Sequence, residues 1–147
     1  MSGGRTGFEG MSGNNPTAFL EAVVDALRLA ASPPAEQIEA LPDFVHVPDE
    51  VALLYDDAFG LVPQIREAEL IDDDQVQVLA ELDRLFEEMS AAADRDQLWT
   101  TEAMSGDVRW ERSRQLAARA LRELGRPASS PRLEGIKWIR GGPAGSA

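Results

Sequence analysis

Residues 47–65 read VPDEVALLYDDAFGLVPQI, the most apolar run of the chain. At 100° per residue, its apolar side chains fill an arc of about 160° around a helix, which is wider than the stripe of an ordinary amphipathic helix. A helix with so broad an apolar surface needs neighbours on more than one side. The stretch therefore predicts a central helix around which the other helices pack. The side chains in this arc are Val51, Leu54, Tyr55, Ala58, Phe59, Leu61, Val62 and Ile65.

The two ends of this stretch carry different signals. Pro48 suits the first turn of a helix, where its missing N–H costs nothing, and Asp49 and Glu50 place negative charge at the positive end of the helix dipole. Gly60 weakens a helix by about 1 kcal/mol relative to alanine, and Pro63 cannot donate to the carbonyl four residues before it. We therefore expect a kink or a break between Gly60 and Pro63. Two shorter helices at an angle fit the stretch as well as one straight helix.

Three other stretches show the same helical period. Apolar residues recur at this spacing in residues 16–31, 72–90 and 107–124. An asparagine or aspartate stands at the start of each as a candidate N-cap, and Gly125 follows the last one as a candidate C-terminal cap. These signals predict three more main helices.

Two shorter helices are expected at residues 34–41 and 98–104, with a polar loop at residues 91–97. The pattern as a whole predicts an all-α fold, a single-domain helical bundle of four main helices plus two short ones. Its core is expected to contain Leu20, Val24, Leu27, Leu54, Phe59, Leu61, Leu79, Leu82, Phe86, Trp110, Leu116 and Leu121.

Composition divides the chain into three parts. Residues 1–14 are rich in Gly, Ser and Asn and are expected to be disordered, residues 15–125 to form the helical domain, and residues 126–147 to form a basic extended tail. The net charge of −12 is unevenly spread, because residues 1–104 carry −17 and residues 105–147 carry +5. The basic C-terminal part is expected to lie against the acidic body. The alternative is that one of the two fields faces a partner.

Composition also excludes several classes of site. The chain has no cysteine and one histidine, His46, which excludes disulfides, thiol catalysis and His-rich zinc sites. The common phosphate-binding and serine-hydrolase motifs are missing from the sequence. Asp56 and Asp57 are adjacent, but successive residues of a helix point about 100° apart, so their carboxylates would not share a proton. No catalytic, cofactor-binding or metal-binding residue is predicted, and the protein is expected not to be an enzyme.

The sequence also bears on location and partner. No apolar run approaches the roughly 20 residues that cross a bilayer, and the N-terminal residues lack the apolar core of a signal peptide. A cytoplasmic protein without membrane contact is therefore expected. The arginines of the C-terminal part, with Trp138 among them, suit nucleic acid, but the acidic body would repel phosphate. A basic protein is the expected partner.

A candidate partner surface lies on the central helix. Glu50, Asp57 and Gln64 are spaced at seven residues and would align along one continuous helix, with Leu53 beside them. This arrangement predicts an acidic strip next to an exposed apolar residue. The partner-binding residues are expected to be Glu50, Leu53, Asp56 and Asp57.

A second class of function stays open beside this one. A small-ligand-binding protein or an enzyme would use a pocket between the helices near Tyr55, His46 and Trp99. His46 is not accompanied by a serine, cysteine or acid in a recognisable catalytic pattern, which favours a structural role for it. The non-catalytic binding module is therefore the preferred interpretation.

The pattern of residues 47–65, followed by LAELDRLFEEMS and by LWTTEAMSGDVRWERSRQLAARALRELG, resembles a family of small uncharacterised bacterial all-helical proteins. In style it is similar to the immunity proteins that neutralise secreted polymorphic toxins. The likeness spans about residues 48–125. It implies a cytoplasmic all-helical binder without catalysis, and no functional residue of the family is carried over.

Overall fold

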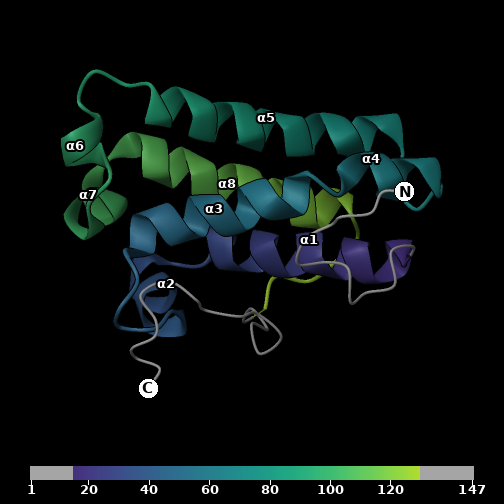
Figure 1. Ribbon diagram of the computed structural model, residues 1–147, viewed down its shortest axis with the longest axis horizontal. Coiled ribbons are helices and arrows are strands. Elements are labelled where there is room, and N and C mark those ends of the chain that lie inside the picture. Colours follow the sequence, from purple (N-terminus) through teal and green to yellow (C-terminus); the bar gives the residue numbers. More distant parts are fainter. Residues whose placement is uncertain (1–14, 130–147) are drawn as a thin grey trace, which may run out of the picture.

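A computed structural model describes residues 15–129, and eight helical segments but no strand occur within them. Four are long: α1 (Pro16–Ala31), α3 (Val47–Phe59), α5 (Asp73–Ser90) and α8 (Val108–Glu123) (Figure 1). The predicted all-α fold with four main helices is confirmed. None of the helices in this part of the chain is long and apolar enough to cross a membrane.

The short helices number four in the described residues, not the two expected: α2 (Pro34–Ala40), α4 (Val62–Glu67), α6 (Arg95–Leu98) and α7 (Thr101–Gly106). Helix α6 occupies the last three residues of the stretch expected to be a loop, together with Leu98. A residue distant in sequence stabilises the start of α6: the guanidinium of Arg109 donates two hydrogen bonds of 3.0 and 2.8 Å to the carboxylate of Asp94. Helices α6 and α7 lie together at one end of the bundle (Figure 1).

The central stretch breaks where it was expected to break. Helix α3 ends at Phe59, and Gly60 and Leu61 form a tight connection in which the N–H of Leu61 donates to the carbonyl of Ala58 at 2.9 Å. Pro63 then occupies the first turn of α4, where its missing N–H leaves no bond unmade.

The local end signals of the other long helices are confirmed as well. The side chain of Asn15 accepts a bond from the N–H of Ala18 at the start of α1. Asp72 and Gln75 form a reciprocal capping box at the start of α5, with both bonds at 2.8 Å. Gly125 follows α8 with φ of 72°, the left-handed conformation that favours glycine.

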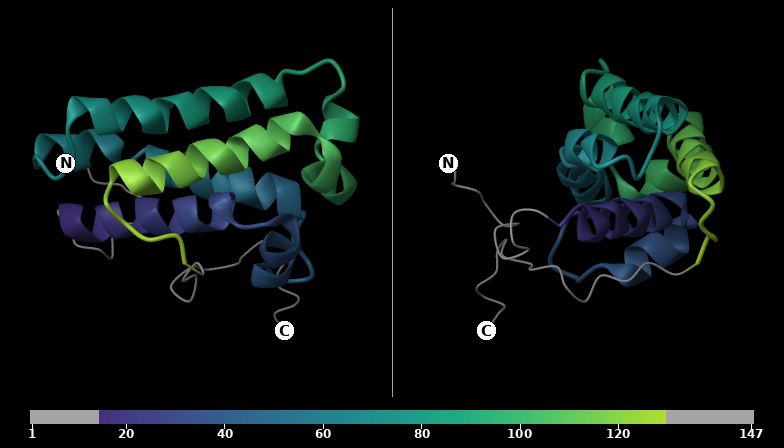
Figure 2. Two further views of the ribbon diagram at one scale, coloured as in Figure 1. Left: turned by 180° about the vertical axis from the view of Figure 1, so that it is seen from behind. Right: turned by 90° about the vertical axis from the view of Figure 1, so that its right-hand side faces the viewer.

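The four long helices are arranged in a ring, which is clearest when the bundle is viewed along its axis (Figure 2). Helix α1 packs closely against α3 and α8, and α5 packs closely against α8, whereas α3 and α5 meet less extensively. Fully buried side chains from all four helices fill the centre, among them Leu27, Tyr55, Leu79 and Trp110. The ring is therefore closed on three sides and looser on the fourth.

Three residues of the expected core are only partly buried: Leu20, Leu54 and Phe59. For Phe59 the reason is the looser fourth side, because this residue lies on the side of α3 that faces α5. Leu54 lies on the opposite edge of the apolar arc of α3, which is wider than the surface that its neighbours cover. The other nine expected core residues are buried.

The chain turns back onto α1 after α8. The guanidinium of Arg126 donates to both carboxylate oxygens of Glu21, at 3.2 and 2.6 Å, and Arg28 donates to the carbonyl of Pro127 at 3.2 Å. The first residues of the expected tail therefore contact α1. The predicted disorder of residues 1–14 and the remainder of the predicted tail, residues 130–147, lie outside the described residues.

Candidate functional site

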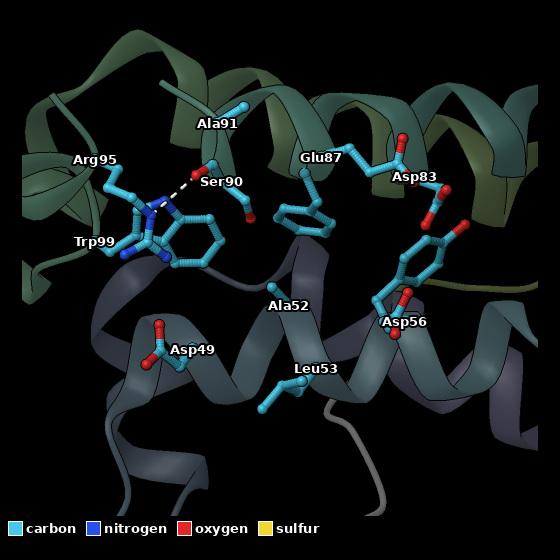
Figure 3. A pocket seen from close by; sticks show the side chains of 12 residues that line it. Asp49, Ala52, Leu53, Asp56, Asp83, Glu87, Ser90, Ala91, Arg95 and Trp99 are labelled. Carbon is cyan, nitrogen blue, oxygen red and sulfur yellow. Dashed lines mark hydrogen bonds between the residues drawn. The ribbon is translucent and has the colours of Figure 1, made fainter. Parts of the chain in front are cut away.

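A groove with a volume of about 590 Å³ lies along the looser side of the bundle, between α3 and α5. Figure 3 shows that Asp49, Ala52, Leu53 and Asp56 come from α3, and that Asp83, Glu87 and Ser90 come from α5. Arg95 and Trp99 close one end of the groove. The remaining lining residues are Tyr55, Phe86 and Ala91.

The floor of the groove is apolar and firmly held. Tyr55 is fully buried and donates its hydroxyl proton to the carbonyl of Leu79 at 2.7 Å, and the Phe86 ring lies 6.0 Å from the Tyr55 ring. The indole N–H of Trp99 donates to the carbonyl of Met89 at 3.0 Å. Burial, with a smaller effect of the Asp83 charge, raises the pKa of Tyr55 far above its ordinary value. Tyr55 therefore acts as a neutral hydrogen-bond donor.

Carboxylates gather at the end of the groove away from Trp99. Asp56 and Asp83 lie at this end on opposite helices, with Glu87 one turn further along α5 (Figure 3). The pKa of Asp83 is raised, mainly by partial loss of solvent and to a smaller extent by the charges of Glu87 and Asp56. Within residues 15–129, none of these three carboxylates takes part in an ion pair. Negative charge at this end is therefore not compensated by the described part of the chain.

The opposite end of the groove carries a cation. The Nε of Arg95 donates to the carbonyl of Ser90 at 2.9 Å, and its guanidinium lies 4.0 Å from Asp96 (Figure 3 shows the first bond). About half of the Arg95 side chain is exposed. Asp49 lies at this end too, so the charge here is mixed, while the Asp83 end is purely acidic.

The predicted partner-binding residues are not all at the surface. Leu53 is 47% exposed and Asp56 is exposed, and both line the groove. Asp57 is exposed but does not line it. The pKa of Asp57 is raised, mainly by partial loss of solvent and to a smaller extent by the charge of Asp56.

The expected acidic strip is wrong at Glu50, which is only 7% exposed. Glu50 stands next to Val51 and three residues from Val47, both buried, and it follows them inward. The strip also fails at Gln64, because the break at Gly60 places Gln64 on a different helix. The surface of α3 that remains is formed by Leu53, Asp56 and Asp57.

The residues expected for a small-ligand pocket are divided. Tyr55 and Trp99 line the groove, whereas His46 does not, since its Nε2 lies 2.9 Å from the carbonyl oxygen of Trp99. The structure thus brings residues from two separate sequence hypotheses into one groove. Sequence reasoning missed Asp83 and Glu87, whose only signal was their spacing of four residues on one side of α5.

The groove combines an apolar floor with an acidic end. Within residues 15–129, no group of three or more histidine, aspartate or glutamate side chains is placed to hold a metal ion. Comparison of the chain with protein-family models, with curated proteins and with solved structures finds no match.

Proposed function

We propose that the protein is a non-catalytic module that binds a basic partner protein in the cytoplasm. The observation that carries this proposal is the exposed surface of α3, where Leu53 lies beside Asp56 and Asp57. An exposed large apolar side chain within a charged surface is typical of a protein contact, in which the apolar residue supplies the packed centre and the charges supply the rim.

The electrostatics support a cationic partner. The raised pKa values of Asp57 and Asp83 reflect partial loss of solvent and repulsion between neighbouring carboxylates. An approaching arginine or lysine relieves this repulsion, which favours binding and speeds the encounter. An inhibitor that neutralises a basic toxin is one protein of this kind, and it is the form that the resemblance to immunity proteins implies.

A small organic cation is a second candidate ligand, and one observation favours it. Trp99 and Phe86 line the same groove as the carboxylates, and aromatic faces beside acids bind cations that carry apolar groups. Leu53 lines the groove but is 47% exposed, which favours the protein partner, because a small ligand would leave much of this side chain in water.

The experiment begins with affinity purification on the immobilised full chain from cells that produce it. A captured protein is then purified, and its affinity is measured by calorimetry for the parent and for Asp56→Asn combined with Asp57→Asn. The matched control is Glu36→Gln combined with Glu39→Gln, since both are exposed residues of α2 and the change in net charge is the same.

We expect the α3 variant to bind about tenfold more weakly or worse, and the α2 control to stay within about twofold of the parent. Equal weakening by both variants would show that only net charge matters and would contradict a specific surface on α3. A captured protein without a basic surface would contradict the proposed partner class.

A further inference from the structure

The groove between α3 and α5 has the length of a short helix. The groove follows α3 from Asp49 to Asp56 and α5 from Asp83 to Ser90 and its C-cap Ala91, with the two helices running in opposite directions (Figure 3). At 1.5 Å per residue, seven or eight residues correspond to about 10–12 Å. This length matches two turns of a further helix that lies along the groove.

Small side chains leave room for such a segment. Ala52 on α3, and Ser90 and Ala91 at the end of α5, line the groove. Leu53, 47% exposed, provides a large apolar contact, and Trp99, 6% exposed, adds a small one. The volume of about 590 Å³ exceeds that of a single side chain. A helix that lies in a groove presents anchors three to four residues apart, and two such anchors suit a site of this size.

The negative charge of the groove favours a docked helix that carries positive charge. Asp56, Asp83 and Glu87 form an acidic end for which the described residues supply no ion-pair partner. An arginine or lysine placed there would meet carboxylates from both helices. An acidic or uncharged segment would leave this repulsion in place, so charge complementarity points to a cationic one.

We infer that the groove between α3 and α5 is the docking site for a basic amphipathic helix of the partner. Its apolar anchors pack on Ala52, Leu53 and Trp99, and its arginine or lysine side chains bind between Asp56 and Asp83. This inference rests on the proposed function and extends the site from α3 to α5. The binding element of the partner is then a helix, which the surface of α3 alone does not specify.

The test uses a phage-displayed library of random 16-residue peptides selected on the immobilised full chain. Enriched peptides are synthesised with a fluorophore, and their affinities are measured by anisotropy. We expect the enriched sequences to combine apolar residues at helical spacing with arginine or lysine. Absence of enrichment, or enrichment of peptides without basic residues, would overturn the inference.

Two matched pairs of variants locate the binding site. Ala91→Trp fills the groove, whereas Ala93→Trp adds the same side chain at an exposed position outside it. Asp83→Asn with Glu87→Gln removes two charges from the groove, whereas Asp74→Asn with Glu88→Gln removes two exposed charges elsewhere on α5. We expect each groove variant to weaken peptide binding at least about tenfold and each control to change it less than about twofold.

Other results assign the groove differently. A full-chain variant with Arg132, Lys137 and Arg140 all changed to glutamine tests whether the chain's own basic segment fills the groove. A tenfold gain in peptide affinity in that variant would overturn the partner as the occupant. Selective displacement of the peptide by micromolar spermidine, with the parent but not with Ala91→Trp, would assign the groove to a small cation and would also overturn it.

Failure of the inference and failure of the proposed function give different results. A captured basic partner that is lost with the Asp56 and Asp57 variant but binds Ala91→Trp as tightly as the parent would support the proposed function and overturn the groove as its site. Peptides that require the groove but carry no basic residue would contradict both the proposed partner class and the inference. Circular dichroism of each variant confirms that the helices are retained.

Discussion

The phenolic oxygen of Tyr55 lies 2.7 Å from the carbonyl oxygen of Leu79, and this hydrogen bond ties α3 to α5 beneath the groove. Tyr55 is fully buried, and its ring is within 6.0 Å of both Phe59 and Phe86. One side chain therefore supplies both the apolar floor of the groove and a polar link between its two walls.

Replacing Tyr55 with phenylalanine removes this link and little else. We expect a loss of about 1 kcal/mol in the free energy of unfolding, the usual net value of a buried hydrogen bond whose removal leaves the ring packing intact. Urea unfolding followed by circular dichroism measures it, and the slope with denaturant should stay unchanged. A variant as stable as the parent would show that the hydroxyl contributes nothing to joining the helices.

Ionisation of Tyr55 should be coupled to unfolding. It is the only tyrosine of the chain, so the tyrosinate absorbance that develops near 295 nm comes from this residue, once the change of the three tryptophans on unfolding has been subtracted. Burial raises its pKa, so the folded protein keeps the phenol neutral where an unfolded chain ionises near pH 10. Stability contributed by the neutral form is present below that value and is lost as pH rises above it. We expect the absorbance change to coincide with loss of helical signal; a separate earlier step at pH 10 would contradict burial.

Two phenylalanines, Phe59 on α3 and Phe86 on α5, differ in burial and should therefore differ in their contribution to stability. Phe86 is buried, with its ring 6.0 Å from those of Tyr55 and Trp110, whereas Phe59 is only partly buried. Phe86→Ala should cost about 3–5 kcal/mol, the usual range for a buried phenylalanine, and Phe59→Ala should cost clearly less. Urea unfolding of both variants gives the comparison, and a larger loss for Phe59 would contradict this ranking.

The end of α8 offers a test of backbone conformation. The N–H of Gly125 donates to the carbonyl of Arg122 at 3.0 Å and that of Arg126 to Leu121 at 2.9 Å, which together form a Schellman motif. Because φ of Gly125 is 72°, Gly125→Ala should lower stability by about 1 kcal/mol. Gly106→Ala is the control, since Gly106 has an ordinary φ and open space around it, and we expect it to be neutral or slightly stabilising. Equal thermal stability of the two variants would argue against this conformation of Gly125.

Much of the fold could be predicted because its causes are local. The caps at Asn15 and Asp72, the break after Gly60 and the left-handed Gly125 each depend on a few adjacent residues. Helix α6 could not be predicted in this way. Its polar sequence favours a loop, and the contact that holds it comes from Arg109, fifteen residues after Asp94.

The site could be predicted only in part, because it depends on which helices become neighbours. Leu53 and Asp56 lie on the stretch that organises the fold, and their sequence already indicated an acidic and apolar surface. Asp83 joins them only through the packing of α3 against α5. Glu50 was misplaced because heptad spacing describes one uninterrupted helix, and it does not say which side of that helix the other three will cover.

Two of the aspartates of α5, Asp83 and Asp73, should respond to pH in opposite directions. Loss of solvent and the charges of Glu87 and Asp56 raise the pKa of Asp83, so the folded protein binds more protons at this residue than the unfolded chain does. The destabilising effect is absent below the ordinary value near 3.8 and develops as pH rises through the raised pKa. Asp83→Asn removes it, so this variant should be more stable than the parent at pH 7 and lose that advantage at pH 3.

Asp73 provides the control with the opposite sign. Its hydrogen bond with Arg66, at 2.8 Å, and the charge of Arg66 lower its pKa, so it contributes stability above its ordinary value and loses that contribution as pH falls. Asp73→Asn should therefore be slightly less stable than the parent at pH 7, by a small amount because the pair is exposed, and this difference should shrink as pH falls toward the lowered pKa of Asp73. Urea unfolding of both variants at the two pH values measures these differences. If Asp83→Asn proved less stable than the parent at pH 7, the Asp83 carboxylate would already be stabilised in the free protein, which would contradict an uncompensated negative charge in the groove.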